Sequence, residues 1–402
     1  MVGLPASEKR VSKPVRKMDG AGYYLRNNVR LIHGGTDYFN LLERLIDEAT
    51  SSIYLQTYIF EADPTGRRVA RALLRAAERN VKVAILTDGY ASQHLPFWLI
   101  ESFRAAGIQF DWFHPLWKGR NFYFGRRLHH KVVVVDSVKA LVGGLNISDR
   151  YNDTDKRPAW LDWAIYVKGD VAMAVERVCQ HRSNISLQDN KHVSSEYVVL
   201  DDPVTETCEV RVRLNDWVNR KMQVTNSYLE MFRRAKSHII LASPYFMPGH
   251  KVRKMMADAV KRGVRVTVIL GSKSDVAIAR FAEEYLYPWL LRNNIEIYEY
   301  QKNVLHGKLA TYDGVWVTNG SYNLNNISAY ASVELNLDVY NRSFACEVER
   351  SLRQTMAEEC ERVTMDHFRK RDNLFRRFLQ RSAYDIIRIV LFLFTFYFRQ
   401  RD

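Results

Sequence analysis

Residues 51–89 read SSIYLQTYIFEADPTGRRVARALLRAAERNVKVAILTDG, and residues 237–271 read SHIILASPYFMPGHKVRKMMADAVKRGVRVTVILG. Each stretch has a short apolar segment, a turn with proline and glycine, a basic segment with helical periodicity, and a second apolar segment. The nearly continuous apolar runs VKVAIL and VRVTVIL are typical of strands buried on both faces of a sheet. The two stretches therefore predict the same strand–helix–strand unit twice.

The similarity between the two halves continues along the chain in the same order. The matching segments are GIQF (107–110) with IEIY (295–298), LHHKVVVVD (128–136) with LHGKLATYD (305–313), and VGGLN (142–146) with TNGSYN (318–323). A repeat of about 180 residues is too long for a solenoid. The sequence thus predicts two similar α/β domains, each a mixed sheet flanked by helices on both faces.

The repeat also predicts where the domains begin and end. We expect a flexible basic leader at residues 1–20, a first domain at 21–200 and a second domain at 215–345. The remaining residues, 346–402, are expected to form a helical tail that ends in an apolar, membrane-associating segment at 384–398.

Composition restricts the compartment and the partners. The chain has 402 residues and a formal net charge of +14, which favours an anionic partner, either nucleic acid or a membrane surface rich in acidic lipid. The four cysteines form no CxxC pair, so a structural zinc site is not indicated, and a reducing compartment fits.

The C-terminal apolar run is IVLFLFTFYF (389–398), with Arg388 before it and Arg399 after it. A helix that began at Tyr384 would be about 22 Å long, shorter than the roughly 30 Å hydrocarbon core of a bilayer. Aromatic residues flanked by arginine favour a helix that lies in the membrane interface. A core helix or a dimer helix is the alternative.

Chemistry is concentrated in the two HxK segments. His129 and Lys131 in the first half correspond to His306 and Lys308 in the second. Residues two apart in a strand point to the same face, so each histidine and lysine project together. Histidine can attack phosphorus or move a proton near neutral pH, and lysine places a positive charge beside phosphate oxygens.

Polar residues follow each HxK segment at a turn. Asn146 in the first half, and Ser321 and Asn323 in the second, could donate hydrogen bonds to the same phosphate oxygens. A single HxK segment followed by a polar turn is weak evidence of function. Two copies at equivalent places in a repeat predict one functional site.

These segments, HHKVVVVD with GGLN and HGKLATYD with GSYN, resemble the phospholipase D superfamily over roughly residues 30–345. The resemblance implies that both motifs meet at a pseudo-twofold interface and form one active site without a metal or other cofactor. It also implies His129 as the nucleophile that becomes a phosphohistidine and His306 as general acid and base, although near-symmetry leaves the order of the two open.

The same resemblance places an acidic residue after each asparagine-containing turn, which points to Asp162 and Glu334 as partners that orient the histidines. Asp136 and Asp313 complete the HxKxxxxD motifs and are counted with the catalytic set. Their odd spacing from the histidines favours a mainly structural role, because it turns them to the other strand face.

Within the superfamily, the chain is similar to the bacterial cardiolipin synthases of the shorter B subgroup. It departs from most cardiolipin synthases at Ile327, where they have arginine. The resemblance implies transfer of a phosphatidyl group, from phosphatidylglycerol to a second phospholipid, at the cytoplasmic face of a bacterial inner membrane to which the protein binds peripherally. Aromatic segments 110–127 and 281–292 could flank the site at the headgroup layer, or pack in the core.

Three other functions remain open from the sequence. A hydrolytic phospholipase D would use water as the acceptor and release phosphatidic acid. A nuclease of the same superfamily would suit the positive charge but does not require the apolar C-terminal segment. A catalytically silent membrane scaffold is disfavoured because every residue of the paired motif is present.

Overall fold

The computed structural model describes residues 22–115, 117–118, 121–122, 126–183, 207–371 and 373–399. The leader expected at residues 1–20 and most of the polar join between the halves lie outside the described residues. Of the apolar segment expected at 384–398, side chains are described up to Val390.

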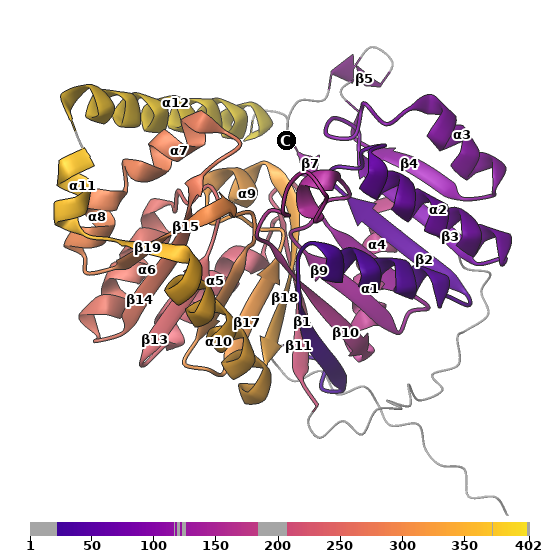
Figure 1. The fold of residues 1–402 in the computed structure, drawn as a ribbon, viewed down its shortest axis with the longest axis horizontal. Coiled ribbons are helices and arrows are strands. Elements are labelled where there is room, and N and C mark those ends of the chain that lie inside the picture. The colour runs from indigo at the N-terminus through magenta and orange to yellow at the C-terminus, as the bar shows by residue number, and fades with distance from the viewer. Residues whose placement is uncertain are drawn as a thin grey trace, which may run out of the picture.

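The first half of the chain forms one mixed sheet with helices on both faces (Figure 1). Its elements, in chain order, are β1 (Asn27–His33), α1 (Thr36–Asp47), β2 (Ser52–Thr57), α2 (Pro64–Glu78), β3 (Lys82–Asp88), α3 (Phe97–Ala105), β4 (Gln109–Phe113), β5 (Trp117–Lys118), β6 (Asn121–Phe122), β7 (Arg127–Leu128), β8 (Val132–Val135), β9 (Lys139–Gly143), a 3-10 turn (Asp149–Tyr151), β10 (Trp163–Gly169) and α4 (Asp170–Ser183).

The second half repeats this arrangement. Its elements are β11 (Glu209–Asp216), β12 (Lys221–Met222), α5 (Gln223–Arg234), β13 (His238–Ala242), α6 (His250–Lys261), β14 (Arg265–Lys273), α7 (Ala277–Glu284), α8 (Tyr287–Arg292), β15 (Glu296–Val304), β16 (Leu309–Tyr312), β17 (Trp316–Gly320), α9 (Asn326–Tyr330), β18 (Ser332–Tyr340), α10 (Arg342–Glu359), β19 (Cys360–Val363), α11 (Met365–Arg371) and α12 (Leu374–Arg399).

Strand order confirms the two-domain α/β fold that the repeat predicts. The first sheet runs β1-β10-β9-β8-β2-β3-β4, and the second runs β12-β11-β18-β17-β16-β13-β14-β15-β19. Apart from the edge strands β12 and β19, each position in one sheet has its counterpart in the other. In both, a parallel trio (β2-β3-β4 or β13-β14-β15) joins an antiparallel set, so the sheets are mixed.

Apolar packing holds the two halves together as well as each half. One buried cluster lies in the first half, around Leu42 and Leu73, and another lies in the second, around Phe232 and Leu290. A third cluster contains side chains from both, including Val142, Trp163 and Leu337. The two sheets therefore share a continuous apolar interface, which fixes the position of one HxK segment relative to the other.

The second half extends beyond the boundary predicted at residue 345. Helix α10 begins at Arg342 and buries Val348 and Leu352 in the shared cluster, as α4 buries Val175 in the first half. Strand β19 then adds an edge to the second sheet by pairing with β15. Residues 346–363 thus belong to the folded second half, and the separate tail begins after them.

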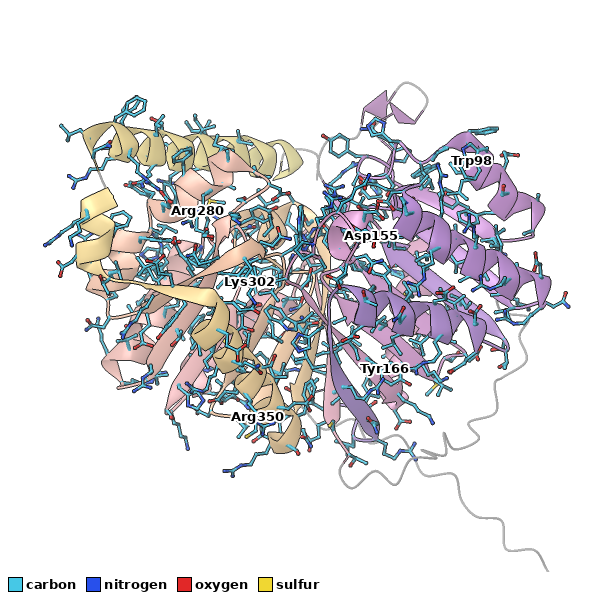
Figure 2. The ribbon with its side chains drawn as sticks, viewed as in Figure 1. Trp98, Asp155, Tyr166, Arg280, Lys302 and Arg350 are labelled. Carbon is cyan, nitrogen blue, oxygen red and sulfur yellow. The ribbon has the colours of Figure 1, made fainter. Side chains whose placement is uncertain are left out.

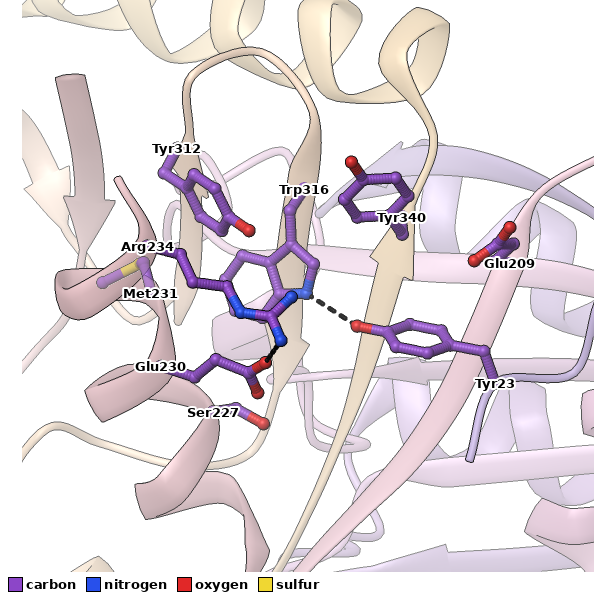
Figure 3. A pocket seen from close by; sticks show the side chains of 9 residues that line it. All are labelled: Tyr23, Glu209, Ser227, Glu230, Met231, Arg234, Tyr312, Trp316 and Tyr340. Carbon is purple, nitrogen blue, oxygen red and sulfur yellow. Dashed lines mark hydrogen bonds and ion pairs between the residues drawn. The ribbon is translucent and has the colours of Figure 1, made fainter. Parts of the chain in front are cut away.

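The first described residues reach across to the second half. Tyr24 pairs with Val210 of β11, and Trp316 Nε1 donates a hydrogen bond to the Tyr23 hydroxyl at 3.1 Å (Figure 3). These contacts surround a small cavity of about 140 Å³ at the β16–β17 turn, at the opposite end of these strands from His306.

Helix α12 lies along one side of the second half, over α7, and its C-terminal end approaches the junction of the two halves (Figure 1). Within the described part of the chain, no helix is both long enough and apolar enough to cross a membrane. In the aromatic segment 281–292, Tyr287 and Leu290 are core residues, whereas Tyr285 is partly exposed and stacks on Tyr384 of α12 at 4.8 Å.

Candidate active site

Backbone pairing across the junction positions both catalytic segments. Leu128 of β7 pairs in parallel with Val333 at the start of β18, and the amide of His129 donates to the Val333 carbonyl at 2.9 Å. In the other direction, the amide of His306 donates to the carbonyl of Leu161 at 2.8 Å. Each HxK segment is therefore hydrogen-bonded to the residue that directly precedes the acidic residue of the opposite half.

The two histidines exchange carboxylate partners between the halves. His129 Nδ1 lies 2.8 Å from Glu334 Oε2, and His306 Nδ1 lies 2.6 Å from Asp162 Oδ2. Both carboxylates are fully buried. The sequence indicated these four residues, and the structure adds that each pair is formed by one residue from each half. Nε2 is the ring atom that points away from the carboxylate in each pair, and in His306 it also lies 3.2 Å from Lys308 Nζ.

Burial and neighbouring charges shift the pKa values of these groups. Burial lowers the pKa of His129, with Glu334 opposing and Lys131 adding to the effect. Burial, Lys308 and Lys131 lower the pKa of His306 well below its ordinary value. Burial also raises the pKa of Asp162 to about 6. By themselves, these shifts favour neutral imidazoles near neutral pH, and an anionic phosphodiester would favour the protonated form by opposing the charges of Lys131 and Lys308.

The two lysines lie behind the histidines, buried from solvent. Lys131 Nζ donates to the His129 carbonyl at 2.9 Å, and Lys308 Nζ donates to the His306 carbonyl. Burial lowers the pKa of Lys308 to about 8, and burial together with Lys308 lowers that of Lys131 well below its ordinary value. Neither lysine lines the cavity that the histidines share, so their charge would act on an anion there at longer range, from behind the histidines.

Both histidines open onto one cavity of about 610 Å³. Asn146 and Asn323, the two asparagines predicted to bind phosphate, line it as well. The side-chain amides of these two asparagines differ in whether they already have hydrogen-bond partners. Asn146 donates to the Tyr151 hydroxyl and accepts from the amide of Ile59. The buried Asn323 Oδ1 has no hydrogen-bond partner among the described residues.

Ser321 was predicted to bind phosphate, and the structure corrects this. It is fully buried, does not line the cavity, and donates its hydroxyl to Glu334 Oε2 at 2.5 Å. Its role is to hold the carboxylate that orients His129. The equivalent residue in the first half is Gly144, where a Cβ would lie 2.4 Å from Asp162 Oδ1, so the asymmetry between the motifs has a steric cause.

The aspartates of the two motifs lie outside the cavity, which corrects their inclusion in the catalytic set. Asp136 accepts hydrogen bonds from the backbone amides of residues 50–52 at 2.8–3.0 Å, and Asp313 accepts from those of residues 236–238 at 2.7–2.9 Å. Both have left-handed backbone conformations, with φ of 52° and 51°. They fix the turn after β8 or β16 to the strand beside it, a structural role that the odd spacing favours.

The residues between His and Lys differ between the halves. His130 is buried away from the cavity, with Nδ1 2.9 Å from Gln56 Oε1, so it is separate from the catalytic pair. Its counterpart Gly307 has no room for a side chain, because a Cβ there would lie 2.3 Å from the Trp163 ring.

Aromatic and basic residues that the motifs did not indicate complete the site. Tyr58 meets the His129 ring edge-on at 5.0 Å, and Tyr151 meets the His306 ring at the same distance. Arg127 and Arg150 also line the cavity. Proximity to the first motif is the sequence signal for Arg127, Arg150 and Tyr151, whereas Tyr58 directly follows β2, far from both motifs in the sequence. Among described side chains, no group of three His, Cys, Asp or Glu residues is suited to hold a metal ion.

Comparison with known proteins agrees with this geometry. The family described as cardiolipin synthase, PLD-like domain, matches residues 42–157 and 228–356, the two repeated units. The chain belongs to this family. Family membership makes it a phospholipase D-type phosphatidyltransferase, and the predicted resemblance is confirmed.

Individual relatives cover most of the chain. Cardiolipin synthase B of Escherichia coli K12 is 30% identical over 84% of this chain and 82% of its own length. A probable cardiolipin synthase of Bacillus subtilis is 26% identical over 86% of this chain and 69% of its own length.

Solved structures show the same fold. The crystal structure of phosphatidylserine synthase from Haemophilus influenzae has a TM-score of 0.70 at 14% identity, covering 93% of this chain and 96% of that one. Polyphosphate kinase from Porphyromonas gingivalis has a TM-score of 0.59 at 16% identity, covering 90% of this chain and 53% of its own.

Proposed function

We propose that the protein is a cardiolipin synthase that transfers a phosphatidyl group from one phosphatidylglycerol to another through a phosphohistidine. The observation that carries the proposal is the pair of histidine–carboxylate contacts, exchanged between the halves and facing one cavity backed by two buried lysines. Two histidines, one to attack and one to move a proton, are what a two-step displacement at phosphorus needs.

In the first step, His129 Nε2 attacks phosphorus, and the bond from phosphorus to the headgroup glycerol oxygen breaks. The His306–Asp162 pair supplies the proton that this oxygen takes as glycerol leaves. Because burial raises the pKa of Asp162 only to about 6, its carboxylate is ionised near neutral pH and can stabilise the protonated His306 that donates this proton. Glu334 stabilises the positive charge that develops on His129.

In the second step, His306 accepts the proton of an acceptor hydroxyl, whose oxygen attacks phosphorus. The bond from phosphorus to His129 breaks, and cardiolipin is released when the acceptor is phosphatidylglycerol. Lys131, Lys308 and Asn323 would stabilise the charge on the phosphoryl oxygens in both steps. Every proton and bond in this scheme is handled by side chains, so no metal is required.

The proposed location is the cytoplasmic face of a bacterial inner membrane, with peripheral attachment through α12. Its exposed Ile386 and Ile389 offer apolar surface to the interface, and Arg388 lies between them. A site that receives lipid directly from the bilayer limits access of water to the phosphohistidine, which favours an alcohol acceptor over hydrolysis.

The experiment is to incubate pure protein, in the presence of EDTA, with vesicles of phosphatidylglycerol with or without phosphatidylethanolamine, and to resolve the lipid products by mass. We expect cardiolipin from the wild type and none from His129→Ala or His306→Ala, because acid–base and nucleophilic groups contribute about 10²–10⁴-fold or more. The exposed His94→Ala serves as the matched control.

Other products would identify the alternatives. Phosphatidic acid alone would mean a hydrolytic phospholipase D. If no lipid changes, the transferase proposal is wrong, and single-stranded and duplex DNA become the substrates to test. Rapid quenching and intact-protein mass should find the phosphatidyl adduct on wild type but not on His129→Ala. A phosphatidyl adduct on the His129→Ala variant would mean that His306 is the nucleophile and that the two roles are exchanged.

A further inference from the structure

We propose that α12 is part of the active site and that its inward face binds an acyl chain of the phospholipid whose phosphodiester lies between His129 and His306. This inference rests on the proposed function, since it names where the lipid substrate lies in that same cavity. It goes beyond membrane attachment, because it gives α12 a direct part in recognising the substrate.

The walls of the cavity differ in chemistry from one side to the other. The apolar side chains that the second half and α12 contribute to the lining, called here the apolar wall, are Met247, Val276, Ile278, Ile327, Ile387 and Val390, and polar side chains of the second half, such as Asp275 and Ser328, line the cavity beside them. Opposite it, the first half contributes Tyr58, Tyr90, Arg127 and Arg150. An amphipathic ligand would therefore place its apolar part toward α12 and its polar part toward the arginines.

Polar contacts fix α12 to the body of the protein. Arg376 lies 2.8 Å from both carboxylate oxygens of Glu284 on α7, and Gln380 donates to the same carboxylate at 3.0 Å. Glu284 also pairs with Arg280 at 3.2 Å, beneath α12 (Figure 2). This network extends inward, because Arg280 contacts the buried Glu299 of β15.

Apolar packing continues from these contacts toward the cavity. Ala383 is buried against Met247, Ala282 and Leu286. Residues 383, 387 and 390 lie on one face of a helix, so docking of Ala383 turns Ile387 and Val390 toward the cavity. Ile387 is half-buried, whereas Val390 lines the rim of the cavity and is itself 43% exposed. Ile386 and Ile389 lie on an adjacent face, are exposed by 49% and 59%, and do not line the cavity.

These two faces make the apolar wall continuous with the surface that would contact a membrane. A hydrocarbon chain could pass from the bilayer to the apolar wall along α12 while its headgroup reaches the histidines. The apolar character argues against a nucleic acid in this position, because such a ligand needs positive or hydrogen-bonding groups along its backbone. A lipid chain is the occupant that fits both the wall and the adjoining exposed face.

The test compares lipid turnover with turnover of a phosphodiester that has no acyl chain. Ile387→Trp and Val390→Trp would be assayed on phosphatidylglycerol vesicles and on bis(4-nitrophenyl) phosphate. We expect each to lose about tenfold or more on the lipid, because the added indole would occupy the place of the acyl chain along the wall. The loss on the lipid should exceed the loss on the chromogenic diester by at least about fivefold, because the diester has no acyl chain to lie along the wall.

Ile386→Trp and Ile389→Trp are the matched controls, since they add the same bulk to the outward faces of the same helix. They should retain lipid turnover. Equal loss in inward and outward variants, or parallel loss of both activities in the inward variants, would overturn the chain-binding role. Full lipid turnover by the inward variants would do so too.

A second variant, Ile387→Ala, enlarges the site. In vesicles that contain a shorter-chain and a longer-chain phosphatidylglycerol, it should shift product composition toward the longer chain, and an unchanged composition would contradict the proposal. Failure of the proposed function can be distinguished from failure of this chain-binding role. If the proposed function is wrong, the wild type would convert the chromogenic diester but no lipid at all.

Discussion

Glu334 contacts His129 across the junction of the two halves, at 2.8 Å and over a separation of 205 residues. Ser321 donates to the same carboxylate oxygen, so a hydroxyl, a carboxylate and an imidazole form a chain that ends at the cavity. Neither half contains a complete site, because the reciprocal contact joins His306 to Asp162. The shared apolar cluster between the sheets therefore holds together both histidine–carboxylate pairs as well as the fold.

Replacing Glu334 by glutamine should keep a hydrogen-bond acceptor beside His129 and remove the negative charge. We expect kcat to fall by about 10²-fold, with KM little changed, because the charge acts on the histidine as it becomes positive. Glu349→Gln is a matched control, since Glu349 lies 2.7 Å from His238 Nε2 outside the cavity. Equal effects of the two substitutions on kcat would show that Glu334 is needed only for folding.

The repeat and its motifs are local signals, and they were sufficient to predict both sheets and to single out the histidines that line the shared cavity. Periodicity identifies a buried strand, and duplicated HxK segments identify His129 and His306. Partner exchange is not encoded locally, because an acidic residue such as Asp162 has the same spacing whichever histidine it meets. The structural role of Ser321 was missed because its hydroxyl suits phosphate and carboxylate equally.

The position of α12 against the second half could not be predicted from the sequence either. Its apolar residues indicated a membrane-binding helix, but docking depends on isolated contacts such as Arg376 with Glu284, which leave no periodic pattern. Likewise, α10 shows an ordinary amphipathic pattern, and only the shared core reveals that it completes the second half.

Asp136 should matter for stability rather than for turnover. Burial raises its pKa, but hydrogen bonds from the amides of Ser52, Thr50 and Ser51 outweigh burial and hold the pKa below its ordinary value. Asp136→Asn should lower the free energy of unfolding by about 1.5–3 kcal/mol, the range for hydrogen bonds to charged groups. Thermal melts and activity per folded molecule would check this, and a large loss of kcat without a change in melting would contradict it.

The stabilisation that Asp136 provides should depend on pH. The pKa of Asp136 is lower in the folded state than in the unfolded state. Its contribution to stability is therefore fully present above the unfolded-state pKa and is lost as the pH falls through the folded-state pKa. The difference in melting temperature between wild type and Asp136→Asn should therefore shrink in acid. A constant difference down to about pH 2 would contradict the assignment, since the unfolded pKa is about 3.9.

Activity should rise and then fall as the pH increases. Asp162, whose pKa burial raises to about 6, is protonated below that pH and can no longer stabilise a charged His306. Lys308, whose pKa burial lowers to about 8, loses its charge above that pH and with it the attraction for phosphate. The value of kcat/KM on bis(4-nitrophenyl) phosphate, measured between about pH 5 and pH 9, should rise and then fall. A flat profile would exclude both groups from the rate.

Membrane binding can be separated from the acyl-chain role of α12. Deleting residues 384–402 should move the protein from the membrane to the soluble fraction, but it also removes Ile387 and Val390 from the cavity. The sharper change is Ile386→Asp with Ile389→Asp, which alters only exposed side chains. Burial of an isoleucine side chain is worth about 1.5–3 kcal/mol, so vesicle binding should weaken by about tenfold or more.

Hydrolysis of the soluble diester should remain, because neither Ile386 nor Ile389 lines the cavity. The valine pair, Ile386→Val with Ile389→Val, should still sediment with vesicles of acidic lipid. If the aspartate pair pelleted as well as wild type, α12 would not be the membrane-binding element. If the aspartate pair lost vesicle binding but kept lipid turnover when the lipid was dispersed in detergent micelles, attachment and chain recognition would be separate properties of two faces of one helix.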